Sequence, residues 1–372
     1  MHVCAAPVQA AVNGVKLECS AFPHASQDAE TITCAETCVW EVVEYYGNKY
    51  QEHSTVLPSE ILTVLKSMSY ERQLPARGLN INQMSYALRK LGFSPRVYGR
   101  SQNPGDFDSL LACYVQSGLP LILAVETVDE PGRPKVKDPI GHAMLCVGYE
   151  AQQEHMVGAV VPLTSPRKTV NDAMKNQGIA LLDYDAMKRR YVFIDDNQPV
   201  YQIQLLNTPC VHYPLPEWHP CRITYFLAPL PEKVYLEASG AKAYVQSMLT
   251  EGPRPLPSGS RTWLRTYHTS SRSLKHWLAT KGFSSPAIRD KLMECVMPKF
   301  VWVTELSTDQ EIKDFKSSGL VILDATEPRT RGNKAHIMSC YDGDVIEGSE
   351  LKRTSLHLPP FNRFENLTKY EA

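Results

Sequence analysis

The sequence predicts an α+β fold in which a helical front half is followed by a half rich in strands. Helical periodicity dominates up to Gly118, and short apolar runs of strand type dominate from Pro120 onward. The third observation is a cysteine, Cys34, at the expected start of a buried helix. In such a domain a helix and a sheet can present polar groups to each other across a cleft.

The length of the chain, 372 residues, allows two domains at roughly 150 residues each. We expect a first domain over residues 1–230, with an insertion at 151–190. A connecting helix and a Pro/Gly/Ser linker are expected over 231–260, because Pro and Gly cluster at 252–260. Residues 261–372 are expected to form a smaller α/β domain, and its sequence indicates no role for it.

The charge balance gives no support to a nucleic-acid or membrane partner. The chain has 39 Lys and Arg against 40 Asp and Glu, a net charge of −1, and is 43% hydrophobic. No apolar run approaches the ~18 residues of a membrane-spanning helix, and the start of the chain lacks the basic and apolar regions of a secretory signal. The ten cysteines are scattered, unlike those of a disulfide framework. These observations predict a cytoplasmic protein with free thiols.

The helix that begins at Cys34 is the best marked element of the sequence. Thr33 is a good N-cap, and Glu36 three residues later can close a capping box. Apolar residues at i, i+3 and i+4 form a stripe that would bury this helix, and Gly47 is expected to end it. The stripe consists of Cys38, Val39, Val42, Val43 and Tyr46.

The position of Cys34 favours nucleophilic chemistry. Backbone N–H groups of a first helical turn stabilise both a thiolate and an oxyanion. A structural cysteine is the alternative interpretation, since cysteine is among the most often buried residues. Cys38 lies four residues on, but no second close Cys/His pair follows, so a zinc site is not expected. We expect no metal and no organic cofactor.

Turn and cap residues mark the other elements of the first domain. Residues 15–20 alternate like an edge strand, Pro58 and Ser59 open a helix, and Gly92 and Gly118 close two more. The expected helices span 59–68, 83–91 and 106–117. The expected strands, which are short apolar runs, span 120–126, 142–150, 191–197 and 222–227.

The last part of the chain again mixes helices and strands. Residues 234–251 are expected to form a strand followed by a connecting helix. Ser285 as N-cap with Pro286 at the first helical position marks a later helix, and Asp342 begins a turn. The expected helices span 273–280 and 285–296, and the expected strands span 300–306, 319–324 and 336–341.

A nucleophilic cysteine needs a general base, and His142 is the best placed of the eleven histidines. It stands at the start of an apolar strand, where a rigid element can aim the ring. Asp195, Asp196 and Asn197 follow another expected strand, so one of these side chains can accept a hydrogen bond from the imidazole. Gln27, upstream of the cysteine, can supply an amide to an oxyanion hole.

These residues together resemble the papain-like cysteine peptidase superfamily, and most closely its bacterial branch of bacteriocin leader (double-glycine) peptidases. In that family the nucleophile and a second, buried cysteine four residues on run into a helix ending Tyr-Tyr-Gly. Cys34, Cys38 and Gly47 match this spacing. The family's Gly-His at the start of an apolar strand is matched by His142 and the glycine before it. The family's strand ending Ala-Asp-Pro aligns with residues 194–197 of this chain. This alignment favours Asp196 over Asp195 as the aspartate of the family's site.

The sequence also departs from the family pattern. Ala35 stands where the family has glycine after the nucleophile, and Asn197 stands where proline commonly follows the aspartate. Gln27 is seven residues before the cysteine, whereas the family's oxyanion glutamine lies six before it. The 54 positions between His142 and Asp196 imply an insertion over the cleft. The resemblance is confined to the first domain.

The resemblance implies a cysteine hydrolase that cleaves a peptide or isopeptide bond through an acyl-enzyme. Cys34 would be the nucleophile, His142 the base, Asp196 the orienting group and Gln27 an oxyanion donor. The same triad could serve a side-chain amidase or transamidase of the glutamine deamidase type. A non-catalytic protein-binding module with a papain-like shape is a further alternative. A protein or peptide substrate is the expected partner, and the sequence leaves the oligomeric state open.

Overall fold

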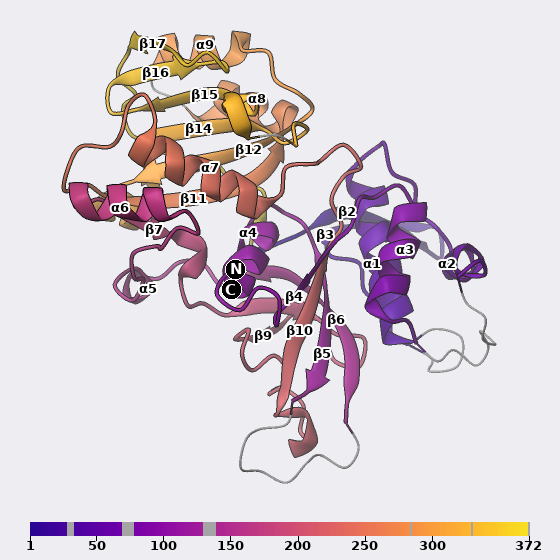
Figure 1. Ribbon diagram of the computed structural model, residues 1–372. Helices are drawn as coiled ribbons and strands as arrows, with labels where there is room; N and C mark the ends of the chain where they lie inside the picture. The colour runs from indigo at the N-terminus through magenta and orange to yellow at the C-terminus, as the bar shows by residue number, and fades with distance from the viewer. Residues whose placement is uncertain (28–32, 69–77, 129–138, 283–284, 329, 371–372) are drawn as a thin grey trace. The chain divides into compact units, whose positions relative to one another are not determined.

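The structure is a computed structural model that describes residues 1–27, 33–68, 78–128, 139–282, 285–328 and 330–370 (Figure 1). The described chain is of mixed α and β type, as the sequence predicts, and holds several separate sheets. It divides into two compact units. Unit 1 comprises Met1–Ala151, Arg189–Glu232 and Leu367–Ala372, and unit 2 comprises Gln152–Lys188 and Lys233–Asn366.

Unit 1 is built on an antiparallel sheet (Figure 1). Its strand order is β19-β1-β6-β5-β10-β4, and β8 and then β9 extend it from β6. The strands are β1 (His2–Val3), β4 (Arg96–Gly99), β5 (Leu121–Thr127), β6 (Gly141–Tyr149), β8 (Tyr191–Ile194), β9 (Gln202–Gln204), β10 (Cys221–Ala228) and β19 (Thr368–Lys369). β6 is buried along almost its whole length, as its continuous apolar sequence requires.

Four α-helices of unit 1 lie where the sequence predicts helices. They are α1 (Cys34–Lys49), α2 (Pro58–Leu65), α3 (Ile81–Lys90) and α4 (Phe107–Gln116). The apolar stripe of α1 is buried as expected. However, α1 does not end at Gly47 but continues to Lys49. The glycine instead permits a close approach, since a Cβ there would meet Thr55 at 2.7 Å.

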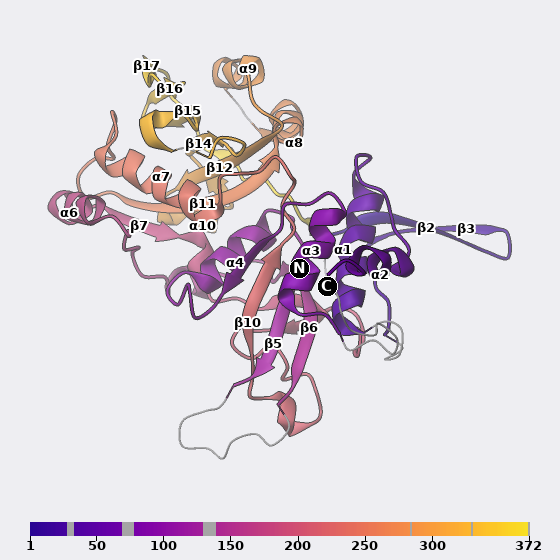
Figure 2. The same cartoon turned by 45° about the vertical axis from the view of Figure 1, so that its right-hand side comes forward.

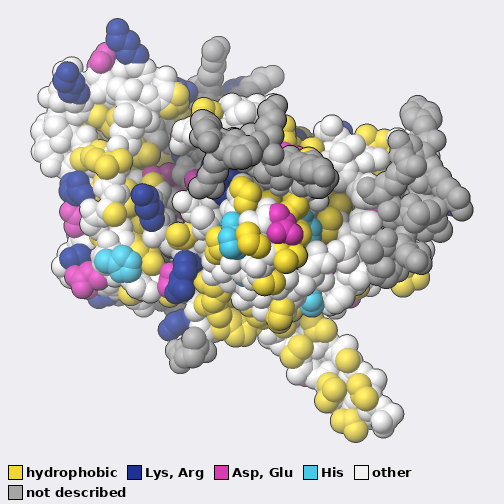
Figure 3. All heavy atoms as spheres, turned by 90° about the horizontal axis from the view of Figure 1, so that it is seen from below, with side chains coloured by type: hydrophobic (Ala, Val, Ile, Leu, Met, Phe, Trp, Pro, Cys, Tyr) yellow, Lys and Arg dark blue, Asp and Glu magenta, His cyan; other side chains and the backbone are white. Residues whose placement is uncertain are grey.

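A two-stranded sheet formed by β2 (Ala6–Val12) and β3 (Val15–Ala21) projects from unit 1 (Figure 2). Asn13 and Gly14 turn it with positive φ angles of 49° and 80°. Directly paired residues share a face, and the register places only apolar side chains on one face. These are Ala6, Val8, Ala10, Val12, Val15, Leu17, Cys19 and Ala21. Much of this face is exposed, and Figure 3 shows hydrophobic side chains along this arm.

Unit 2 holds a sheet ordered β17-β16-β15-β14-β12-β11-β7. Its strands are β7 (Ala180–Asp183), β11 (Arg261–Ser270), β12 (Phe300–Ser307), β14 (Gly319–Asp324), β15 (His336–Tyr341), β16 (Asp344–Glu347) and β17 (Lys352–Ser355). The pairs are antiparallel except that β7 runs parallel to β11. A small sheet of β13 (Lys316–Ser317) and β18 (Phe361–Asn362) accompanies it.

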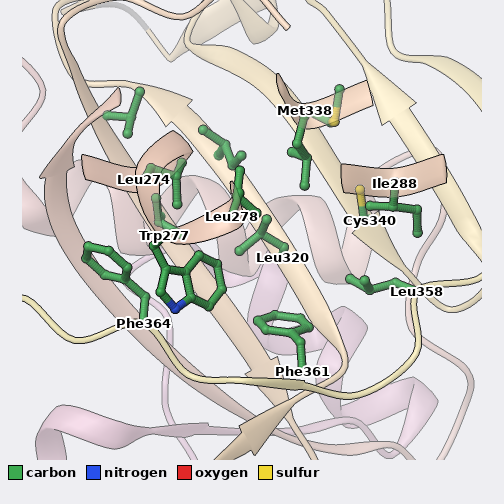
Figure 4. Packing of buried hydrophobic residues seen from close by; sticks show 14 of the residues in the cluster. Leu274, Trp277, Leu278, Ile288, Leu320, Met338, Cys340, Leu358, Phe361 and Phe364 are labelled. Atoms are coloured by element: carbon green, nitrogen blue, oxygen red, sulfur yellow. The ribbon is translucent and has the colours of Figure 1, made fainter. Parts of the chain in front are cut away.

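Helices of unit 2 cover both faces of this sheet. Val301 and Val303 belong to a core beneath α8 (Ser271–Trp277) and α9 (Pro286–Glu294). Trp302, which lies between these two valines in the strand, faces the opposite side of the sheet. Its indole N–H donates to Leu236 O at 2.8 Å. On that other side α7 (Ala238–Glu251) packs on β11 and β12 and is contacted by α6 (Lys168–Gln177). The shorter helices are α5 (Glu154–Val157) and α10 (Asp309–Lys313). Figure 4 shows the core under α8 and α9: Leu274, Trp277, Leu278, Ile288, Leu320, Met338, Cys340, Leu358, Phe361 and Phe364.

The two compact units do not follow the expected domain boundaries. Residues 152–188, expected as an insertion in the first domain, belong to unit 2 because β7 completes its sheet. The expected linker at 252–260 joins α7 to β11 within unit 2 and thus connects two elements of one core. The last residues return to unit 1, where β19 pairs with β1. None of the helices in the described part of the chain combines the length and the hydropathy that a membrane span requires.

Candidate active site

Cys34 is the first residue of α1, as the sequence predicts, and its side chain is half-buried. Thr33 has the extended backbone of an N-cap but makes no side-chain bond to the first-turn N–H groups. Instead its hydroxyl donates to the Glu36 carboxylate, so the expected capping box is not formed. The first turn of α1 therefore presents its N–H groups without competition from the Thr33 hydroxyl.

His142 lies at the start of β6 and is 8% exposed. Its Nε2 lies 3.0 Å from Oδ1 of Asp195. Cys34 lies close enough to the ring to raise the pKa of the imidazole, and since Asp195 occupies Nε2, Nδ1 is the ring nitrogen left for the thiol. The structure thus brings together a cysteine at a helix start and a histidine at a strand start, which are 108 positions apart in the sequence.

Asp195, which directly follows β8, is held by several donors. Tyr213 Oη donates to its Oδ2 at 2.8 Å, and the backbone N–H of Asn197 donates to Oδ1 at 3.1 Å. His212 Nε2 lies 3.4 Å from Oδ2. Burial raises the pKa of Asp195, but the hydrogen bonds from His142 and His212 outweigh it and hold the pKa well below its usual range. Asp195 is therefore a fixed negative charge beside the imidazole.

The hydrogen bond to His142 comes from Asp195 and not from Asp196, the residue that the family resemblance favours. Asp196 Oδ1 lies 4.0 Å from His142 Nε2, beyond hydrogen-bond distance. Among the described residues, neither of its buried carboxylate oxygens has a hydrogen-bond partner. Burial, together with the nearby charges of Asp195 and Glu41, raises the pKa of Asp196 to about 6 although His142 opposes the change.

The protonation of His142 follows from this surrounding charge. Burial lowers the pKa of the imidazole, but the interactions with Asp195 and Cys34 outweigh burial and raise the pKa to about 10. His142 is accordingly an imidazolium at neutral pH. A positive charge at this point stabilises negative charge that develops on the neighbouring sulfur.

Two aromatic side chains that the sequence analysis did not select complete the surroundings of His142. Tyr213 and Trp218 stack with ring centroids 3.8 Å apart and an interplanar angle of 2°. The rings of Trp218 and His142 form a T-shaped contact with centroids 5.3 Å apart. Trp218 ends the short 3₁₀-helix η2 (Pro216–Trp218). The signal in the sequence is a run of aromatic and histidine residues from His212 to His219 in a Pro-containing stretch.

Gln27 is placed near the loop that follows Asp195. Its side-chain amide donates to Asn197 Oδ1 at 2.6 Å. The segment before it is held by Glu41 of α1, whose Oε1 accepts from Ala25 N at 2.9 Å and lies 3.3 Å from His24 Nδ1. The predicted oxyanion donor is thus tied to the site through Asn197, and its role toward an oxyanion stays a prediction. Thr31 and Ile32, expected just before the helix, lie outside the described residues.

His142, Asp195 and Asp196 also offer three potential metal ligands whose atoms lie within 4.8 Å of one another. Imidazole and carboxylate are donors that zinc accepts. However, Asp195 already accepts from Tyr213 and from Asn197, and His142 bonds with Asp195. The donors are directed at one another, which suits proton transfer better than coordination.

No family model matches this chain, and no curated protein resembles it closely enough to count as a relative. The function is therefore inferred from the geometry of the site. That geometry joins a histidine and an aspartate by a hydrogen bond, with a cysteine near the imidazole.

Proposed function

We propose that this chain is a cysteine hydrolase that cleaves a peptide or isopeptide bond, with unit 1 as a papain-like catalytic domain. The observation that supports it is the imidazole of His142, which bonds with Asp195 and whose pKa is raised by the nearby Cys34. A nucleophile, a base and a group that orients the base are the three parts of such a site. Here Asp195 takes the orienting role.

In the proposed reaction Cys34 Sγ attacks the carbonyl carbon of the scissile amide, and its proton resides on His142. N–H groups at the start of α1 stabilise the oxyanion of the tetrahedral intermediate. His142 then gives the proton to the leaving amine, and an acyl-enzyme on Cys34 remains. A water molecule attacks this thioester with His142 as base, which releases the carboxylic acid and restores the thiol.

Asp195 and the residues around it keep the imidazole in the tautomer and orientation that this reaction needs. Because Tyr213 and the Asn197 N–H also donate to its carboxylate, the side chain cannot rotate freely. Trp218 packs against the His142 ring, and His142 is only 8% exposed. Exclusion of water strengthens the electrostatic interactions between the charged groups.

The proposal is tested first by alkylation. The intact protein is treated with iodoacetamide over a range of pH, and the labelling of each cysteine is followed by peptide mass spectrometry. We expect Cys34 to label at least ~10-fold faster than the exposed Cys19 near pH 6, because the imidazolium stabilises the developing thiolate. The His142→Ala variant should lose this advantage, while Cys19 labelling stays unchanged. Equal rates for Cys34 and Cys19 in the wild type would overturn the thiolate–imidazolium pair.

Turnover is then measured on a peptide library by mass spectrometry, together with ammonia release. Cys34→Ala should reduce cleavage by about 10³-fold or more without changing the circular dichroism spectrum. Release of ammonia without chain cleavage would assign the site to a side-chain amidase instead. Fast labelling of Cys34 without any turnover would favour a non-catalytic protein-binding module.

A further inference from the structure

The outer edge of β3, on the arm that projects from unit 1, is open to a further strand (Figure 2). Among the described residues, β2 is the only strand that pairs with β3. Val12 and Val15 flank the two-residue turn and therefore form a hydrogen-bonded pair, from which the two kinds of antiparallel pair alternate along the arm. The backbone N–H and C=O groups of Lys16 and Glu18 consequently point away from β2.

The end of this edge that lies nearest to unit 1 is already occupied. Ser20 O accepts a hydrogen bond from the Tyr370 hydroxyl. Just beyond the strand, Phe22 N donates to Tyr201 Oη at 3.0 Å. The part of the edge that a further strand can use is therefore residues 15–19.

The outer edge of β2 is less suited to another strand. Pro7 stands at a position whose backbone points away from β3, and proline has no N–H to donate. β3 contains neither proline nor glycine, and it pairs with β2 in one continuous register without a bulge. A flat, regular edge of this kind accepts a further strand readily.

Two charged side chains decide which strand fits the edge of β3. Lys16 Nζ lies 2.8 Å from Glu18 Oε1, and the two side chains are 64% and 59% exposed. Opposite charges two residues apart complement a second copy of the same strand when that copy runs antiparallel. A two-fold axis through Leu17 places Lys16 opposite the second copy's Glu18. An axis through Lys16 or Glu18 would instead place like charges opposite each other.

The axis through Leu17 also satisfies the backbone and the apolar face. The outward groups of Lys16 and the second copy's Glu18 form a hydrogen-bonded pair, which exchanges two N–H···O bonds. Leu17 meets its own copy in a non-hydrogen-bonded pair, where side chains approach most closely, and Val15 meets the second copy's Cys19. Val15 and Leu17 are 60% and 50% exposed in the single chain.

We propose that two copies of this chain dimerise by antiparallel pairing of their β3 strands about a two-fold axis at Leu17. The two arms then form one four-stranded sheet with a continuous apolar face. Such a sheet is more stable than a lone two-stranded hairpin, which is marginal in water. The inference does not depend on the proposed hydrolase activity, because a dimer is detected by its mass.

The test is sedimentation velocity of the full chain in dithiothreitol, over concentrations of about 1 to 100 µM. We expect a monomer–dimer equilibrium. Lys16→Glu places glutamates opposite each other and Glu18→Lys places lysines opposite each other, so each should raise the dimer dissociation constant about 10-fold or more. The double variant Lys16→Glu/Glu18→Lys restores both ion pairs and should return the constant to within about 3-fold of the wild type.

Two outcomes of this test contradict the proposal. One is a chain that stays monomeric throughout the range, and the other is a dimer that neither single variant weakens. A monomer that sediments with phosphatidylcholine vesicles, and no longer does so as Leu17→Asp, would assign the apolar face of the arm to a lipid surface instead of a second copy.

A cross-link tests the register directly. In a Cys19→Ser background, Leu17→Cys should form a disulfide-linked dimer under mild oxidation, because a non-hydrogen-bonded pair brings Cα atoms to about 4.5 Å. Glu18→Cys in the same background is the matched control. It lies opposite the second copy's Lys16 and should cross-link at least ~10-fold more slowly. Equal or faster cross-linking through Glu18→Cys would show that the axis does not pass through Leu17.

Discussion

Two adjacent carboxylates have opposite environments at this site. Asp195 accepts hydrogen bonds from His142, Tyr213 and the Asn197 N–H, whereas the oxygens of Asp196 have no such partner among the described residues. The pKa is accordingly held low at Asp195 and raised at Asp196. One carboxylate is therefore a permanent anion, and its neighbour changes charge close to neutral pH.

The first prediction compares the activities of Asp195→Ala and Asp196→Ala. Loss of Asp195 removes the partner of His142 Nε2 and should lower kcat/KM by about 10²-fold. Loss of Asp196 leaves that hydrogen bond in place and should lower kcat/KM by less than about 10-fold. The measurement is steady-state kinetics on whichever peptide substrate the library identifies. The reverse ranking would return the orienting role to Asp196.

The second prediction concerns stability and pH. Because the pKa of Asp196 rises from 3.8 to about 6 on folding, the folded state binds this proton more tightly than the unfolded state. The stability that this carboxyl contributes is present below pH 3.8 and is lost as the pH rises through 6. Asp196→Asn should therefore raise the free energy of unfolding by up to about 3 kcal/mol at pH 8, at ~1.4 kcal/mol per pH unit, and by little at pH 4.

Urea unfolding of the wild type and the variant at these two pH values checks the second prediction. Asp195→Asn is the matched control and should behave oppositely. The pKa of Asp195 is lowered on folding, so its contribution is present above pH 3.8 and is lost only as the pH falls. Equal stability changes for Asp196→Asn at pH 4 and pH 8 would contradict the prediction.

The sequence could place Cys34 and His142 because each stands at the end of a well-marked element. The choice between Asp195 and Asp196 could not be made in the same way. β8 ends at Ile194, and the chain turns immediately after it. The alternation of side chains along a strand no longer applies in a turn, so only the backbone path decides which carboxylate faces His142.

At the scale of elements, helix α1 shows how a glycine can have a packing role where the sequence indicates a helix end. Gly47 lies inside the helix, and a Cβ there would meet both the side chain and the backbone N of Thr55 at 2.7 Å. The sequence pattern of a terminal Tyr-Tyr-Gly cannot distinguish these two uses. The distinction depends on a segment that follows the helix and packs back on it.

The third prediction follows from this contact. Gly47→Ala should lower the free energy of unfolding by about 1–3 kcal/mol, because backbone atoms must move to admit the methyl group. Gly240→Ala in α7 is the matched control, since its Cβ would meet a Leu236 side-chain carbon at 3.0 Å and that side chain can shift. The control should gain up to about 1 kcal/mol from helix propensity. Thermal and urea unfolding measure both, and a stabilised Gly47→Ala protein would disprove the tight contact.

The β2–β3 arm marks another limit of reading elements from sequence. Residues 15–20 alternate as expected for a strand, and the structure pairs them with β2. Alternation identifies an apolar face but not whether anything covers it. Val12, Val15 and Leu17 are each at least half exposed in the structure, so the pattern of a buried strand occurs here on a projecting one.

At the scale of the whole molecule, the chain leaves and re-enters unit 1 twice. The sequence alone predicts contiguous domains, with the stretch 151–190 in the first of them. The pairing that decides otherwise is parallel, between β7 and β11, whose residues are about 80 positions apart. No local sequence pattern predicts such a pairing, because the sequence of each strand would allow it to pair with several other strands.

The fourth prediction is that residues 152–188 depend on unit 2 for their structure. In a chain ended at residue 232, β7 has lost β11 and α6 has lost α7. Limited proteolysis should therefore cut 152–188 at least ~10-fold faster in this chain than in the intact protein, where the segment is packed. Equal protection in both chains would show that the segment folds with unit 1 after all.

A designed deletion makes this prediction sharper. Tyr149 of β6 pairs directly with Tyr191 of β8, and Glu150 N donates to Arg190 O at 2.8 Å, so the two strands already approach as a hairpin does. In the chain ended at residue 232, an Asn-Gly turn can replace residues 152–188. We expect this shortened chain to unfold in one cooperative transition and to show the fast alkylation of Cys34. If this shortened chain unfolds without cooperativity while the version that keeps 152–188 unfolds cooperatively, the segment stabilises unit 1 and its assignment to unit 2 is wrong.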